Sequence, residues 1–167
     1  NWDVSSGTDF ELMFYMANAF NQDIGSWDVS SGTSFLAMFQ WADAFNQDID
    51  RWDVSSGTDF FGMFSGAKAF NQDIGNWDVS SGTDFELMFY RANAFNQDIS
   101  NWDISEAATL NNMFTEADLM LSNQGFSATP TSADFNKNNV FKNRTSLDTA
   151  VAAWIADEEA ATATYGD

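Results

Sequence analysis

Residues 1–8 read Asn-Trp-Asp-Val-Ser-Ser-Gly-Thr, and Trp-Asp-Val-Ser-Ser-Gly-Thr returns directly after Ser26, Arg51 and Asn76. A degraded copy, Trp-Asp-Ile-Ser, follows Asn101, so the chain is one 25-residue unit written five times. The first four copies are identical at 17 of the 25 positions. Tandem repeats of this length are typical of solenoids, in which each repeat forms one rung that contacts only its neighbours. The sequence therefore predicts a repeat solenoid whose important residues form columns, with one residue from each rung.

Each rung is predicted to contain a short helix and a short strand. Apolar residues fixed at i, i+3, i+4 and i+7 indicate a helix with one buried face, and Thr8 is suited to be its N-cap. These fixed residues are Phe10, Met13, Phe14 and Ala17. The spacing Ile24-x-x-Trp27-x-Val29 is that of the strand in leucine-rich repeats. We therefore expect a leucine-rich-repeat-like fold with a short parallel β-strand and a short helix per rung, and with strands about 4.8 Å apart.

Two regions are expected along the chain. Residues 1–125 are predicted to form five rungs that start at residues 1, 26, 51, 76 and 101, and residues 126–167 a C-terminal helical cap or spacer. A helix is expected near 146–157, because apolar residues there fall on one face and can cover the last rung. The chain begins within a repeat and without an initiator Met, so it is expected to be a piece of a longer protein.

Composition excludes several classes of function. Six Lys and Arg against 25 Asp and Glu give a net charge of −19, which would repel nucleic acid and anionic membranes. The chain has no Cys and no His, so neither disulfides nor the usual zinc ligands are present. It also has no apolar run long enough to insert into a membrane. A uniform ladder of carboxylates lacks the two unlike environments that an acid and a base need, so we do not expect an enzyme.

The motif of the repeat resembles a known family. Ala-Phe-Asn-Gln-Asp-Ile-x-x-Trp-Asp-Val-Ser, followed by Thr-Asp-Phe and Met-Phe-x-x-Ala, is similar to the bacterial-type surface-protein repeat of 25 or 26 residues. That family has no known function and is related to the BspA-like leucine-rich repeats. The resemblance covers residues 1–118, and the tail from Ser146 is similar to the spacer between blocks of such repeats. It implies a solenoid at the cell surface or in secreted material, used for adhesion or as a stalk, and it carries over no catalytic residues.

The sharpest column is acidic. It contains Asp3, Asp28, Asp53, Asp78 and Asp103. Carboxylates about 4.8 Å apart repel by roughly 1 kcal/mol in a water-like dielectric, so something must offset that repulsion. One interpretation is an Asx-turn in which each Asp accepts hydrogen bonds from backbone N–H groups nearby. The other is Ca²⁺ bound between rungs, because hard oxygen ligands at regular spacing suit that ion.

Two further columns and one motif complete the candidates. Asn21-Gln22-Asp23 and its copies are expected to hydrogen-bond from rung to rung through their amides, although their aspartates could join a metal site. The variable helix face could contact a partner, or its side chains could simply pack between adjacent rungs. Its candidate residues are Tyr15, Met16, Trp41, Phe61, Tyr90 and Arg91. Asn143-Arg-Thr is a candidate glycosylation site.

The sequence thus favours a non-enzymatic, extracellular or cell-surface repeat module for adhesion, recognition or spacing. Its expected partner is a protein or a glycan at a cell surface, and no cofactor is expected besides the candidate Ca²⁺. The alternative is a filament subunit that stacks head-to-tail with copies of itself through the uncovered rung at Trp2, with calcium as a candidate requirement. Binding of ice or crystal surfaces by the regular Ser and Thr columns is a third hypothesis, weakened because Thr8 is better suited to be a helix cap.

Overall fold

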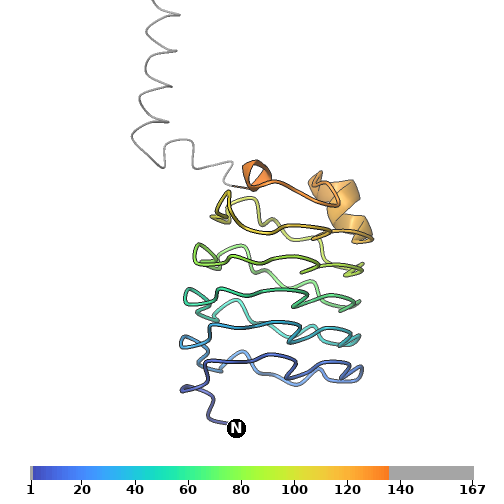
Figure 1. The fold of residues 1–167 in the computed structure, drawn as a ribbon. Coiled ribbons are helices and arrows are strands. Elements are labelled where there is room, and N and C mark those ends of the chain that lie inside the picture. Colours follow the sequence, from blue (N-terminus) through green and yellow to red (C-terminus); the bar gives the residue numbers. More distant parts are fainter. Residues whose placement is uncertain (1, 136–167) are drawn as a thin grey trace, which may run out of the picture. The chain divides into compact units, whose positions relative to one another are not determined.

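The repeats stack as successive turns of one coil in the computed structural model, which describes residues 2–135 (Figure 1). The chain divides into two compact units, Asn1–Asn136 and Lys137–Asp167. The first unit extends beyond the predicted boundary at residue 125, because Phe126 and Phe135 belong to its hydrophobic core. The candidate helix near 146–157 and the sequon at Asn143 lie outside the described residues.

Two short helices follow the repeats. Element η1, a π-helix, spans Met120–Gln124, and η2, a 3₁₀ helix, spans Ser132–Asp134. Among the described residues neither helix is long and apolar enough to cross a membrane. The repeats themselves contain neither the predicted helix nor a strand of several residues, so other hydrogen bonds must link the rungs.

The prediction of a helix after Thr8 is wrong, because this segment forms consecutive turns. The backbone of Leu12 and Met16 is left-handed, with φ near 56° at both residues. The N–H of Tyr15 donates to the carbonyl of Leu12 at 3.0 Å, and the N–H groups of Met13 and Ala17 close two further four-residue turns of the same kind. The same left-handed positions recur in every rung, and in the third rung both are glycines, Gly62 and Gly66.

The other backbone N–H groups of this segment link the rungs. In the first rung the N–H groups of residues 10, 12, 14 and 16 donate to the carbonyls of residues 34, 36, 38 and 40. The same four bonds recur between all five rungs, at 2.6–3.1 Å. Residue Asp9 pairs with Ser34 in a parallel bridge that continues from rung to rung. An α-helix would use the N–H groups beyond its first turn internally, so those of residues 14 and 16 could not join neighbouring rungs.

The burial pattern of this segment explains why its sequence resembles that of a helix. In the second rung Phe35, Met38, Phe39 and Ala42 are fully buried, which is the i, i+3, i+4, i+7 set. Successive turns therefore present the same side chains to the core as one face of a helix would. Apolar periodicity predicts which residues are inside, and it does not distinguish these two backbones.

In the segment predicted to be a strand, side chains are buried and exposed as expected, but the backbone does not form the hydrogen bonds of a β-sheet. Val29 and Trp52 are buried, and Asp28 is exposed. Within the described repeats, no backbone hydrogen bond joins one Trp-Asp-Val-Ser segment to the next. Instead the indole N–H of Trp52 donates to the carbonyl of Ile24, one turn of the coil earlier, at 3.2 Å. The assignment to a leucine-rich-repeat-like solenoid stays a prediction.

Columns of stacked aromatic rings form the core. The ring of Phe39 lies between that of Phe14 in the preceding rung and that of Phe64 in the following rung, with centroid distances of 5.4 and 5.6 Å. Within its own rung Phe39 also stacks on Phe45 at 3.9 Å. Because each ring has partners above and below, a rung gains most of its stability from its neighbours.

The segment after the fifth rung covers the C-terminal end of the stack. The ring of Phe126 packs on Phe114 at 5.1 Å, and Phe135 packs on Phe126 at 5.0 Å. The N–H of Phe114, which would face a sixth rung, donates to the carbonyl of Ala128 at 2.9 Å. Residues 119–135 therefore replace the contacts of a further rung at this end, and we call them the cap.

Candidate interaction surface

The variable side chains at the fifteenth and sixteenth positions of the rungs form the surface that we call the lateral face. It contains Tyr15, Met16, Gln40, Trp41, Tyr90 and Arg91. Met16 is 59% exposed and Tyr15 is 42% exposed, whereas Trp41 and Tyr90 are half-buried. Phe61 comes earlier in its rung and is half-buried, with its N–H bonded to Asp59. The structure thus leaves the apolar candidates of the first rung the most accessible.

Trp41 owes its position to a glycine in the next rung. A Cβ atom at Gly66 would collide with the six-membered ring of Trp41, lying 2.6 Å from Cζ3 and 2.7 Å from Cδ2. The indole therefore lies directly against the backbone of Gly66. It fills the space that a side chain at position 66 would need. This contact matches the interpretation that the variable side chains pack between rungs, and it also fixes an aromatic ring that remains partly accessible.

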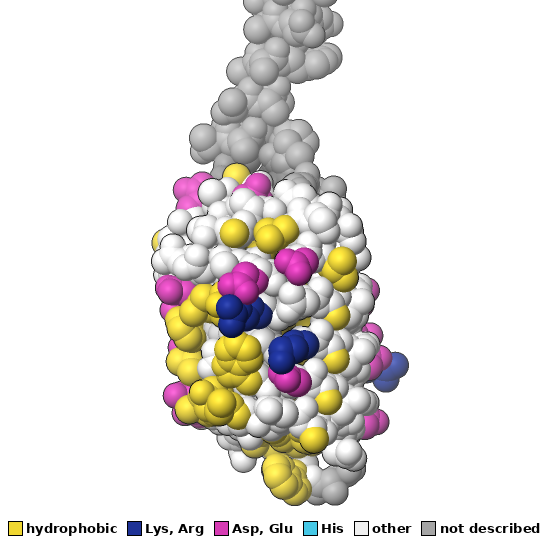
Figure 2. Space-filling view, turned by 90° about the vertical axis from the view of Figure 1, so that its right-hand side faces the viewer, with side chains coloured by type: hydrophobic (Ala, Val, Ile, Leu, Met, Phe, Trp, Pro, Cys, Tyr) yellow, Lys and Arg dark blue, Asp and Glu magenta, His cyan; other side chains and the backbone are white. Residues whose placement is uncertain are grey.

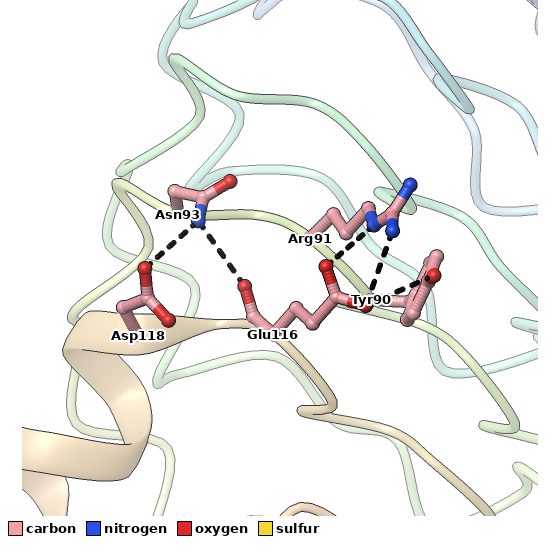
Figure 3. A network of polar contacts seen from close by, with 5 residues as sticks. All are labelled: Tyr90, Arg91, Asn93, Glu116 and Asp118. Atoms are coloured by element: carbon pink, nitrogen blue, oxygen red, sulfur yellow. Dashed lines mark hydrogen bonds and ion pairs between the residues drawn. The ribbon is translucent and has the colours of Figure 1, made fainter.

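Tyr90 and Arg91 join the last two rungs through a polar network (Figure 3). The guanidinium of Arg91 donates to both carboxylate oxygens of Glu116, at 2.7 and 3.1 Å, and lies 5.0 Å from the ring centre of Tyr90. The hydrogen bond from Arg91 lowers the pKa of Glu116. The amide of Asn93 donates to the carbonyl of Glu116 and to the carboxylate of Asp118, both at 3.2 Å. Arg91 is therefore held in place by a neighbour within the chain.

Charged pairs flank hydrophobic side chains on this side of the molecule. Figure 2 shows a face on which hydrophobic side chains gather beside basic and acidic side chains. The ammonium of Lys68 lies 2.8 Å from the carboxylate of Asp43, one rung away. An apolar strip with charged neighbours is typical of a surface that contacts another molecule.

The acidic column makes Asx-turns, as one of the two interpretations predicts. Asp3 accepts hydrogen bonds from the N–H and the hydroxyl of Ser5, at 3.1 and 2.7 Å. Equivalent bonds hold Asp28, Asp53 and Asp78. The bond from the serine hydroxyl, followed by that from the serine N–H, lowers the pKa of Asp3, which keeps this carboxylate ionised. Asp103 is the last member of the column.

The structure does not gather these aspartates around a metal position. Among the described residues no group of three or more acidic side chains could hold a metal ion. The carboxylates of Asp3, Asp28, Asp53 and Asp78 each use one oxygen for the serine two residues on. Asp23 likewise accepts the N–H of Gly25 at 3.0 Å. A calcium ion would have to use the other oxygens together with backbone carbonyls. The calcium site therefore stays a prediction.

The comparisons with known proteins give one match. The family described as "Mycoplasma protein of unknown function, DUF285" matches residues 1–73 and 52–154. The chain belongs to this family. No curated protein and no solved structure matches the DUF285 chain significantly. The match supports a repeat domain of unknown function, as the five copies of the motif predict.

The polar ladder of the DUF285 repeat is built from its Asn-Gln pair. The side-chain oxygen of Asn46 accepts hydrogen bonds from the N–H of Asn71 at 2.9 Å and from the amide of Gln72 at 2.8 Å. The expected rung-to-rung bonds are therefore present, although the glutamine amide and the backbone supply the donors. Sequence reasoning missed the end of this ladder, where Gln124 of η1 donates to Asn96. The signal that could have predicted this bond is the presence of Gln124 near the end of the degraded fifth repeat.

The first rung of the DUF285 chain exposes an apolar layer. Trp2 is 68% exposed, and Trp27 is only half-buried, whereas the equivalent Trp52 is 3% exposed. A shallow hollow in this layer is lined by Trp2, Phe14, Phe20, Gln22, Asp23, Ile24 and Trp27. Among the residues that the structure describes, none covers this layer.

Proposed function

We propose that the chain is a non-enzymatic repeat module that binds a protein or a glycan at a cell surface, serving in adhesion, recognition or spacing. The position of Trp41 carries this proposal. Its indole is held against the backbone of Gly66. A partner that bound this ring would therefore lose little affinity to the conformational entropy of fixing the side chain. Tyr15 and Met16 extend the apolar surface toward the first rung.

The repetition of the acidic sites supports a role without catalysis. Asp3, Asp28, Asp53 and Asp78 each bind the serine two residues on, with nearly the same distances. An acid–base pair requires two carboxyl groups in different environments, whereas these environments are copies of one another. The column is better suited to closing the same turn in each rung.

The location and the finer family assignment are part of the proposal. The motif's resemblance to BspA-like leucine-rich repeats supports an extracellular or cell-surface location and a solenoid related to leucine-rich repeats. The net charge of −19 fits a protein or glycan partner better than a nucleic acid or an anionic membrane. Calcium, if bound by the acidic column, would reinforce the stack or a contact made by it.

A binding assay with matched variants tests this function. The chain would be displayed on beads and measured against a glycan array, immobilised mucin and immobilised fibronectin. We expect saturable binding to one of these surfaces, and a loss of at least tenfold in affinity for Trp41→Ala. The control is Leu119→Ala, because Leu119 is a similarly accessible apolar residue, 38% exposed, in the cap. Equal affinity of both variants, or binding to none of the surfaces, contradicts the proposal.

Head-to-tail assembly is the second candidate function, and the exposed apolar layer around Trp2 favours it. The cap disfavours it, because Phe126 and Phe135 occupy the place where the next copy would meet the fifth rung. Electron microscopy at high protein concentration distinguishes the cases. Filaments support assembly, and short single particles exclude it.

A further inference from the structure

The third rung of the DUF285 chain lacks side chains at both of its left-handed positions, because these are Gly62 and Gly66. In the other rungs the same two positions hold larger residues. The side-chain amide of Gln40 lies over Gly62, with its nitrogen 3.2 Å from the place of a Cβ, and the indole of Trp41 lies over Gly66. Two neighbouring side chains of the second rung therefore rest on bare backbone of the third.

Polar groups with unused hydrogen-bonding capacity flank Trp41. The backbone N–H and carbonyl of Gln40 are both bonded, but its side-chain amide makes no hydrogen bond with a described residue. The carboxylate of Asp43 accepts the ammonium of Lys68 through Oδ2 at 2.8 Å, and its Oδ1 accepts none from the described residues. Asp43 follows Trp41 by two residues and Lys68 follows Gly66 by two, so this accessible ion pair spans the same two rungs as the ring.

The charges near the ring are balanced in pairs. Lys68 is paired with Asp43, and Arg91, at the position of Gly66 in the fourth rung, binds Glu116 through Nε and Nη2. An anionic ligand would have to displace a carboxylate from one of these cations, and the net charge of −19 would also repel it. These residues therefore favour a neutral ligand that offers both donors and acceptors of hydrogen bonds.

The small apolar area at this place favours a sugar over a protein. A stable protein interface buries about 800 Å² on each partner around an apolar centre. Here one half-buried indole is bordered by Gln40 and Asp43 along its rung and by Lys68 of the next rung. Sites for small ligands instead combine an apolar surface with a few placed polar groups. Trp41 and its neighbours match that second description.

We infer that Trp41, Gln40, Asp43 and Lys68 form a site for a neutral hexose ring of a glycan, an inference that rests on the proposed function and narrows its partner to a glycan. A hexose ring has a face of C–H groups that can lie on the indole, and its hydroxyls both donate and accept hydrogen bonds. Oδ1 of Asp43 would accept from one hydroxyl, and the ammonium of Lys68 would donate to another. The second and third rungs each have a described rung on both sides, so the exposure of these residues is that of interior rungs.

Nuclear magnetic resonance titration of the complete chain provides the test. The probes are the methyl glycosides of glucose, galactose and mannose, each compared with the glycoside of its uronic acid. We expect at least one neutral glycoside to shift the indole N–H resonance of Trp41 saturably, and its uronic acid counterpart to bind at least tenfold more weakly. Affinity in the millimolar range is expected, because a single sugar ring offers few atoms. The resonance is assigned by its loss in Trp41→Phe.

Variants locate the sugar on the lateral face, with saturation transfer to the sugar as the readout. Trp41→Ala should weaken binding at least tenfold, and Gln40→Ala and Asp43→Ala at least threefold each. The matched control is Asp118→Ala, because Asp118 has the position of Asp43 in the fifth rung but follows Glu116 where the second rung has Trp41. Its binding should equal that of the unmodified chain. Unchanged indole resonances of the buried tryptophans confirm that each variant keeps the stack.

Three results would overturn the inference. They are no saturable binding of any neutral glycoside, equal binding by the unmodified chain and Trp41→Ala, and equal affinity for a hexose and its uronic acid. Loss of fibronectin binding in Trp41→Ala, with none of the sugars bound, would overturn the hexose site and leave the proposed function standing with a protein partner. Binding to neither sugars nor any of the immobilised surfaces would overturn both.

Discussion

Replacing Gly66 by alanine should destabilise the stack more than the same change at Gly62. Both glycines have a left-handed backbone, with φ of 71° and 58°. A non-glycine residue in that conformation costs about 1–2 kcal/mol, partly offset by the ~0.5–1 kcal/mol that glycine loses in the unfolded chain. Each variant should therefore lose about 1 kcal/mol of unfolding free energy from the backbone alone.

The neighbours of the two positions differ. The new Cβ at position 62 would lie 3.2 Å from the end of the flexible side chain of Gln40, which can move away. At Gly66 the Cβ would overlap the indole of Trp41, which has to leave its place. Losing about 50–80 Å² of buried apolar area costs a further 1–2 kcal/mol at about 25 cal/mol per Å². Urea unfolding should then give Gly66→Ala a loss of about 2–3 kcal/mol.

A double-mutant cycle tests the cause of this difference. In a chain that already carries Trp41→Ala, the cost of Gly66→Ala should fall to that of Gly62→Ala, because no indole remains to be displaced. If Gly66→Ala and Gly62→Ala are equally destabilising in the unmodified chain, or if Trp41→Ala leaves their difference unchanged, the argued contact does not hold Trp41. The result also bears on binding, since Gly66→Ala displaces the ring that we propose a partner contacts.

Three further predictions concern the core, the half-buried Asp84 and calcium. Phe64→Ala should cost about 3–5 kcal/mol by urea unfolding, as for other buried aromatic residues, whereas Phe14→Ala should cost less because the first rung has a neighbour on one side only. Burial, together with Asp59 and Glu86 nearby, raises the pKa of Asp84, so its ionised form is disfavoured in the fold and stability should rise as pH falls from 7 through that raised pKa. Asp84→Asn should accordingly raise the melting temperature at pH 7 and lose this advantage below the pKa of an unfolded aspartate; an unchanged melting temperature at pH 7 would contradict the assignment. Millimolar Ca²⁺ should raise the midpoint of thermal unfolding by several degrees over Mg²⁺ at equal ionic strength if the acidic column binds it, and circular dichroism showing equal midpoints would return those aspartates to turn formation alone.

The acidic column and the amide ladder show how far local chemistry can be predicted. An aspartate two residues before a serine suffices to predict the Asx-turn at Asp3, because every atom involved lies within three residues. The fixed Asn-Gln pair similarly predicts bonds from rung to rung, although the identity of the donors depends on how closely the rungs approach. The variable positions predicted a contact surface, but not that Trp41 would rest on a glycine 25 residues away.

The sequence by itself determined the period and the residues that face the core. These follow from identity at fixed spacing and from apolar patterning, which need no knowledge of the backbone. Only the tertiary structure decided that residues 9–17 form turns instead of a helix. A helix satisfies its N–H groups within itself, whereas here alternate N–H groups are satisfied by the next rung. That choice depends on a neighbour 24 residues away, so no local pattern could reveal it.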